Sequence, residues 1–381
     1  MTAVMSPGLR RFTKPATVVA ILVVALLLPF MLSDYWLSTA AFVLIAAIGA
    51  LGLEVLTGRT GQISLGHAFF LATGAYVAGW IGGNEHMSAA VWLPAAGIVA
   101  GVLGAVVGPF ALRLRGLYLA IVTIGLVYIG QYLAATWTGF SEGAGGRSIP
   151  DVTFGSLNFT NGFSLGSLSI NRNGCYYYLA LIILVLAMLY VRNVTRSTLG
   201  RSMVAVRDRE LAAAVLGVNV ARTKVRAFVI SSALAGISGA LYGAFLSFVV
   251  PQEWGLVLSI QYVVMIVVGG MTSLWGPVLG SIFVIGLPAL LQDVSSSIPF
   301  LSNGSNNGVI APSDAANIVF GVVLVAFLIL EPRGVVGIGH RIAGLARRRA
   351  AAQAAQAAQA PPPDTTTPTN PTSHEEVQAT S

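Results

Sequence analysis

The chain has 381 residues, of which 55% are hydrophobic and only 9% are charged, and its formal net charge is +7. Its mean hydropathy is +0.80. A soluble globular domain carries about 25% charged residues, so this composition excludes a soluble protein and indicates an integral membrane protein. Cys175 is the only cysteine, which excludes an intrachain disulfide, a thiolate zinc site and an iron–sulfur cluster.

About ten apolar segments predict an all-α fold, a polytopic bundle of transmembrane helices. They cover residues 16–32, 37–57, 64–82, 89–112, 117–137, 176–191, 227–250, 257–270, 277–292 and 315–330. The first segment follows Arg10, Arg11 and Lys14, as in a signal peptide, but a second apolar segment comes almost at once. We therefore interpret the first as a retained helix or signal anchor. The eighth and ninth segments are short for a full crossing and are predicted to be tilted, broken or re-entrant.

Basic residues predict the orientation of the chain, because cytoplasmic loops collect Lys and Arg. With the N-terminus inside and successive segments alternating, every basic residue except Arg147 and Arg172 falls on the inner side. The sequence thus predicts a cytoplasmic N-terminus (1–15), a transmembrane domain (16–337) and a cytoplasmic tail (338–381). Within the transmembrane domain, residues 138–175 form an outer loop and residues 192–226 form an inner loop.

The tail is rich in Ala, Gln, Pro and Thr and is predicted to be disordered. Three consecutive arginines lie near its start, at Arg347, Arg348 and Arg349. Their position beyond the last apolar segment fits binding to anionic lipid headgroups. A plain stop-transfer anchor explains the same residues equally well.

Charged residues are almost absent from the apolar segments. Glu54 lies near the inner end of the second, where it is predicted to snorkel or to pair with Arg59, and His67 lies at the inner start of the third. Ion-coupled transporters and intramembrane enzymes need carboxylates or catalytic pairs at depth, and none is visible. The sequence also has no GxxxxGK[ST] motif, so the chain is not expected to hydrolyse ATP. Two classes remain: a passive channel, or one subunit of a transporter whose energy source lies in another subunit.

The inner loop, 192–226, is strongly basic, and residues 202–216 are predicted to form one short amphipathic helix. Five apolar residues lie loosely on one side of that helix: Met203, Val206, Leu211, Ala214 and Val215. Gly217 suits its C-terminal cap. The helix either docks into a partner at the inner membrane face or belongs to an ordinary basic loop that only fixes topology.

Five stretches carry a family resemblance. The sequence DRELAAAVLG, at 208–217, resembles the EAA-type loop of ABC importer permeases, with Glu210, Ala213 and Gly217 on the motif positions. Residues 58–76 (GRTGQISLGHAFF…GAY), 112–123, 197–201 and 269–280 resemble the M-type permeases of branched-chain amino-acid importers, the Liv system. The resemblance runs from about residue 37 to 337. It leaves out the first apolar segment and the tail, and it is poor at 138–175.

The resemblance implies an ABC importer permease fold in a bacterial-type plasma membrane, working by alternating access. In such an assembly a second, usually non-identical permease completes the path, two ATPase subunits bind ATP inside, and a solute-binding protein delivers substrate outside. The implied ATPase-coupling loop contains Glu210, Ala213 and Gly217, together with Arg201 and Arg207. No metal, no cofactor and no nucleic acid is expected, only membrane lipids beside the protein partners. Branched-chain amino acids are the implied substrate, with urea, short amides or other amino acids as alternatives.

Gln62, Ser64 and His67 lie at the start of the third apolar segment and are candidates for the translocation path or its inner gate. The alternative is structural: Ser64 caps the helix and His67 bonds to a neighbouring helix. A stand-alone channel or facilitator would also explain the uncharged segments. It would not explain the basic loop at 192–226.

Overall fold

The structure is a computed structural model that describes residues 23–85, 87–112, 117–154, 157–159, 163–165, 168–296 and 312–330, with 334, 335 and 337. All of them belong to one compact unit, Met1–Ile338. The predicted N-terminal segment 1–15, the tail and its three arginines lie outside the described residues, as does most of the first apolar segment.

Long apolar helices dominate the part of the chain that is described. By length and composition, six of them could cross a membrane: Asp34–Gly58, Ala89–Phe110, Tyr118–Thr136, Arg172–Arg196, Val220–Leu246 and Gly276–Asp293. Two shorter apolar helices cover Leu256–Gly269 and Ile318–Phe327. The prediction of a polytopic helical membrane protein is confirmed.

The elements that form these segments follow one another with short connections. They are α2 (Asp34–Leu53), α3 (His67–Gly79), α4 (Ala89–Leu112), α5 (Leu117–Thr136), α7 (Arg172–Arg196), α10 (Val220–Leu246), α11 (Leu256–Gly269), α12 (Gly276–Ser281), α13 (Leu287–Ser296) and α15 (Pro312–Leu330). Three π-helical turns extend or link them: η2 (Glu54–Gly58), η3 (Trp80–Asn84) and η6 (Ile282–Gly286). The predicted ninth segment is thus a helix interrupted by a π turn, η6, which joins α12 to α13.

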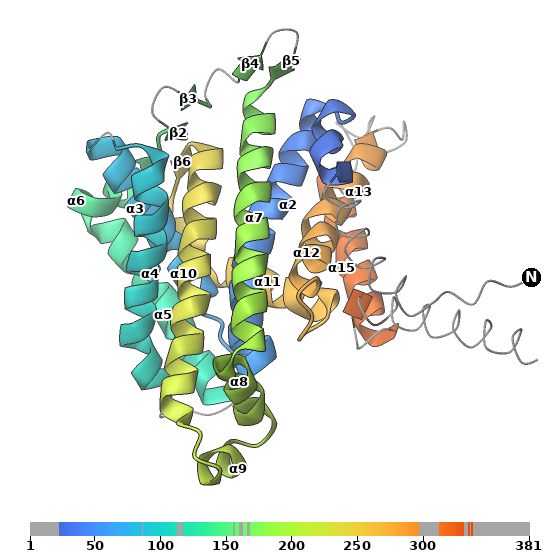
Figure 1. Cartoon of the computed structure of the whole chain (residues 1–381). Coiled ribbons are helices and arrows are strands. Elements are labelled where there is room, and N and C mark those ends of the chain that lie inside the picture. Colours follow the sequence, from blue (N-terminus) through green and yellow to red (C-terminus); the bar gives the residue numbers. More distant parts are fainter. Residues whose placement is uncertain are drawn as a thin grey trace, which may run out of the picture. The chain divides into compact units, whose positions relative to one another are not determined.

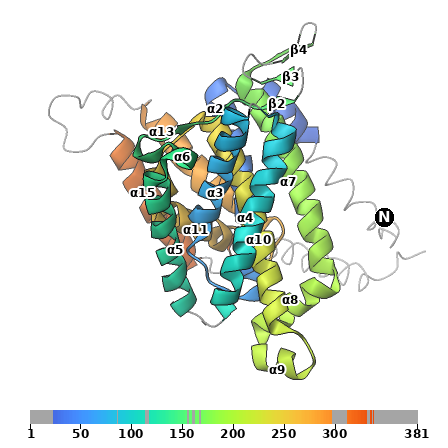
Figure 2. The same ribbon diagram turned by 90° about the vertical axis from the view of Figure 1, so that its left-hand side faces the viewer.

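Helix α10 forms the centre of the bundle and packs against α2, α3 and α4 (Figures 1 and 2). Small residues allow this. A Cβ added to Gly74 would lie 1.9 Å from the Gly236 carbonyl oxygen, and one added to Gly236 would lie 2.5 Å from the Ala96 carbonyl oxygen. Close backbone approach through small residues is how helices pack in lipid, where apolar burial alone gives little driving force.

Short strands gather at one end of the bundle, and α8 (Thr198–Asp208) and α9 (Glu210–Val215) lie at the other (Figure 1). The strand pairs are all antiparallel. They join β1 (Arg147–Ser148) to β6 (Phe248–Val249), β2 (Thr153–Phe154) to β3 (Leu157–Asn158), and β4 (Phe163–Leu165) to β5 (Leu168–Ile170). The predicted outer loop therefore contains regular structure, beginning with the short helix α6 (Thr138–Ser141).

Candidate functional site

The predicted single helix at 202–216 is wrong, because the chain forms two helices there. Arg209 separates α8 from α9 with an extended backbone, φ −152° and ψ 96°. The predicted apolar side is thereby divided. Met203 and Val206 of α8 are buried in the bundle, whereas Val215 of α9 is exposed.

Helix α9 projects from the bundle and exposes apolar side chains. Leu211, Val215 and Leu216 are 73%, 88% and 83% exposed, and we call these three residues the apolar tip. Ala213, one of the motif positions of the implied coupling loop, is buried against its own chain. The helix ends as predicted at Gly217, whose φ of +84° suits the left-handed position that follows a helix.

An ion pair ties α9 to the start of α10. Glu210 Oε1 lies 2.9 Å from Lys224 Nζ, and the Lys224 side chain is only 9% exposed. Asn219 caps α10 by accepting a hydrogen bond from the Arg222 backbone N–H at 2.9 Å. The apolar tip is thus carried on a base that is fixed to the central helix.

The two arginines assigned to the coupling loop lie in different surroundings. Arg201 is exposed, and its guanidinium donates to the Arg196 carbonyl oxygen at 3.4 Å. Arg207 turns toward its own bundle: Nη1 donates to the Gly58 carbonyl oxygen at 3.0 Å, and Nη2 lies 3.0 Å from Asp208 Oδ1. Arg207 therefore joins the coupling loop to the segment that contains Gln62, Ser64 and His67.

Those three candidate path residues are buried inside the bundle, each 5% exposed or less. Ser64 is not a helix cap, since α3 begins at His67 with Gly66 before it, and Ser64 Oγ only accepts from the Gly66 N–H at 3.3 Å. His67, the first residue of α3, packs against a neighbouring helix, α11. Its ring centroid lies 5.0 Å from that of Tyr262, and Nε2 has no hydrogen-bond partner among the described residues.

Glu54 is fully buried, so the expectation that it snorkels is wrong and the expectation of a pair with Arg59 is confirmed. Arg59 Nε donates to Glu54 Oε1 at 2.9 Å. A buried carboxylate is costly to desolvate unless it is paired, and this pair holds the end of α2 to the segment that follows it.

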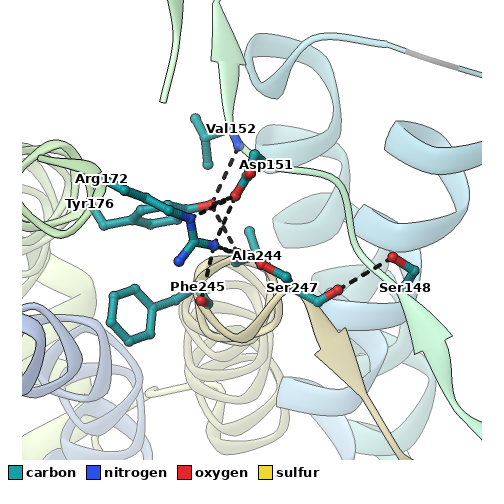
Figure 3. Close-up of polar contacts among 8 residues, drawn as sticks. All are labelled: Ser148, Asp151, Val152, Arg172, Tyr176, Ala244, Phe245 and Ser247. Atoms are coloured by element: carbon teal, nitrogen blue, oxygen red, sulfur yellow. Dashed lines mark hydrogen bonds and ion pairs between the residues drawn. The ribbon is translucent and has the colours of Figure 1, made fainter. Parts of the chain in front are cut away.

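A polar network at the opposite end joins the outer segment to two helices (Figure 3). Arg172, at the start of α7, reaches Asp151 Oδ1 at 2.8 Å, Ser247 Oγ at 2.7 Å and the carbonyl oxygens of Ala244 and Phe245 at 3.3 and 3.2 Å. The Tyr176 hydroxyl donates to the Ala244 carbonyl at 2.9 Å. Sequence reasoning missed this network because it used Arg172 only as a charge that reports the side of the membrane.

Helix α5 is the least buried of the six long helices, since only 28% of its most apolar stretch is buried. Tyr118, Tyr128 and Tyr132 are 71%, 57% and 70% exposed on it. A cavity of about 460 Å³ separates it in part from α3 and α4, lined among others by Thr73, Tyr76, Leu103, Leu133 and Trp137. Sequence reasoning did not identify this tyrosine-bearing face, although spacing on a helix would have placed Tyr128 and Tyr132 together.

These features define a polytopic helical membrane protein with a projecting helix tip suited to a partner, and with no group of three metal-ligating side chains within its described part. Residues 35–328 match the family model described as the permease component of branched-chain amino acid transport systems. The chain belongs to this family of ABC importer permeases. It is therefore a transport subunit and not an enzyme, as the sequence resemblance implied.

Individual relatives agree with the family. The high-affinity branched-chain amino acid transport system permease protein LivM of Escherichia coli (strain K12) is 35% identical over 72% of this chain and 68% of its own length. LivM of Salmonella typhimurium is 34% identical over the same shares. The autoinducer 2 import system permease protein LsrC of Enterobacter sp. (strain 638) is 29% identical over 48% of this chain and 50% of its own length. Among solved structures, none matches the chain significantly.

Proposed function

We propose that this chain imports branched-chain amino acids as one of two permease subunits of an ABC importer, by alternating access driven by separate ATPase subunits. The family and its LivM relatives support the substrate class. Both termini lie in the cytoplasm, about ten segments cross the membrane, and ATP is bound only by the partner subunits.

The apolar tip of α9 carries the proposal. Exposed apolar side chains on a projecting helix mark an interaction site, because water solvates them poorly. Leu211, Val215 and Leu216 are exposed at the end where the basic loop lies, which is the cytoplasmic side by the charge rule. The ATPase subunit covers this tip. Because Glu210 is paired with Lys224, a push on α9 is passed to α10.

A second, non-identical permease completes the path. The exposed face of α5 favours this arrangement, because the hydroxyl groups of Tyr128 and Tyr132 would find no hydrogen-bond partner in hydrocarbon. In the assembly that face lines the route between the two permease chains. Gln62, Ser64 and His67 form its inner gate, shielded by α11 and α2 in the state described.

The experiment is a pull-down of the C-terminally tagged chain from mild-detergent extracts of native membranes, followed by reconstitution into liposomes. A second permease, ATPase subunits and a solute-binding protein are expected to co-purify. Liposomes loaded with ATP should take up labelled leucine, isoleucine and valine, and urea or acetamide should not compete.

Two results would contradict the proposal in different ways. Uptake of urea or acetamide with no uptake of leucine would refute the substrate class and leave the ABC role standing. Recovery of the chain alone, with solute flux in liposomes that contain neither partner nor ATP, would show a stand-alone channel.

A further inference from the structure

Residues 58–66 connect the coupling loop to the membrane helices. At one end of this segment, Arg207 donates to the Gly58 carbonyl oxygen across 149 positions of sequence. The stem of the same side chain lies against Gly61, where an added Cβ would be 3.0 Å from Arg207 Cγ. Gly61 has a φ of +70°, which favours glycine. The segment is therefore shaped to receive Arg207.

At its other end the segment is bonded to two further helices. The Leu65 N–H donates to Thr123 Oγ1 of α5 at 2.9 Å, and a Cβ added to Gly66 would lie 3.1 Å from Thr123. Immediately beyond it, the Ala68 N–H donates to Ser259 Oγ of α11 at 3.0 Å. Backbone N–H groups at the start of α3 thus take partners from α5 and α11 rather than from water.

The segment is braced internally, because Gln62 Nε2 donates to Thr60 Oγ1 at 3.0 Å, and it is bonded to the turn before it. A displacement at one end should therefore reach the other. Thr57 Oγ1 donates to the Gln62 carbonyl oxygen at 2.9 Å, and the Gln62 N–H donates to the Leu56 carbonyl at 3.3 Å. The Arg59–Glu54 pair fixes its start to α2. A tightly packed segment with these internal bonds shifts as a unit, because packed protein interiors are poorly compressible.

We propose that residues 58–66 transmit movement of the coupling loop to α5, with Arg207 and Thr123 as the positioning residues at its two ends. The inference rests on the proposed function and assigns Arg207 to a contact within the permease rather than to the ATPase surface. Helix α5 is suited to respond, because it is the least buried long helix and a cavity borders it. Its tyrosine-bearing face would then open and close the path as the coupling loop moves.

The test uses the full complex in liposomes and measures three quantities: co-purification of the ATPase subunits, ATP hydrolysis stimulated by the liganded binding protein, and labelled leucine uptake. Arg207→Ala and Thr123→Val are each expected to keep assembly and to lower the number of solutes imported per ATP by about tenfold, since each removes the bond that joins residues 58–66 to its neighbour at that end. Arg207→Lys retains a cationic donor and should recover the ratio to within about threefold of wild type.

Matched variants control for loss of charge or hydroxyl alone. Arg192→Ala removes an exposed arginine from the same basic region, and Thr136→Val removes a hydroxyl on α5 that bonds only the Tyr132 carbonyl of its own helix. Both should keep the wild-type ratio. An unchanged ratio in Arg207→Ala and Thr123→Val overturns the inference, as does a parallel fall in stability, hydrolysis and uptake at a constant ratio. In either case co-purification of ATPase subunits would leave the proposed function intact, whereas its absence from the wild-type chain would refute that function.

Discussion

The two ends of this bundle use similar residues in opposite ways. At the strand-bearing end, Arg172 bonds to Asp151, Ser247 and the last turn of α10, so its polar groups are satisfied within one chain. At the other end, Glu210 and Lys224 form a comparable ion pair, but the helix they anchor exposes an apolar tip.

We call the strand-bearing end the closed end, because its polar groups bond to one another, and the end with α8 and α9 the open end, because its apolar tip is exposed. A polar network whose donors and acceptors are paired within one chain holds elements together and needs no partner protein. An apolar tip fixed to a central helix is stable only when something covers it, and whatever covers it can move that helix. The end that carries α8 and α9 is thus suited to be moved by a partner, and the strand-bearing end to keep α7, α10 and residues 147–170 together.

The largest effect is expected from making the open end polar. Val215→Asp with Leu216→Asp places two carboxylates in the proposed ATPase contact. This change should cost about 2–4 kcal/mol of binding, roughly 30- to 1,000-fold in affinity. The ATPase fraction that co-purifies from detergent extracts measures it, with leucine uptake falling in parallel.

Thr198→Asp is the matched control for this pair, since it adds an acid to the exposed first turn of α8, where the helix dipole tolerates one. Its ATPase association should equal that of wild type. Normal association of the double variant would mean that the apolar tip is not the docking surface.

Disrupting the Arg172 network at the closed end should have a smaller effect. It should lower the stability of the complex and leave its assembly unchanged. Arg172→Ala removes the ion pair with Asp151 and the bonds to α10, at a cost of about 2–3 kcal/mol. The melting temperature of the purified complex should fall while ATPase association stays normal. Ser148→Ala, which removes a single 3.4 Å contact to the Ser247 carbonyl, should have little effect. Loss of ATPase binding in Arg172→Ala would contradict the division between the two ends.

Hydropathy predicted the helices well, because burial in lipid requires long apolar runs. Residues 89–112 were predicted as one segment and form α4 with the same bounds. The ends of α7 and α10 were missed by several residues, since Arg172, Arg222 and Arg226 belong to helices that continue into polar surroundings. The small strands at 147–170 were not predicted, because β1 pairs with the distant residues of β6 and the β2–β3 and β4–β5 pairs are too short to show an alternating pattern.

The sequence predicted only part of the candidate site. Periodicity could not reveal the break at Arg209, whose extended backbone follows no turn signal in the sequence. The motif at 58–76 was noticed, but its contacts with Thr123 and Arg207 join residues far apart in the sequence. The pair of Glu54 and Arg59, five positions apart, did follow from sequence spacing.

A smaller effect is expected from the ion pair between Glu210 and Lys224, which tests how α9 is anchored to α10. Glu210→Gln leaves Lys224 charged, nearly buried and without its carboxylate, whereas Lys224→Met replaces the lysine with an apolar side chain of similar length. Removing one partner of a buried pair costs more than replacing the buried charge itself. Glu210→Gln should therefore destabilise the complex by about 1–2 kcal/mol and Lys224→Met by less, a difference readable in their melting temperatures. Equal effects would mean that the pair does not anchor α9.

The smallest effect concerns one hydroxyl at the closed end. Tyr176→Phe keeps the ring, which lies under the Arg172 guanidinium at 4.9 Å. It removes the hydroxyl's bonds to Ala244 and Asp151 and a 3.4 Å bond accepted from the Val152 N–H. The Ala244 carbonyl still has Arg172 as a donor, so the loss should be about 1 kcal/mol, well below that of Arg172→Ala. Tyr190→Phe, exposed on the same helix, is the control and should melt as wild type does. A loss in Tyr176→Phe as large as that in Arg172→Ala would show that the tyrosine, and not the arginine, closes this end of the bundle.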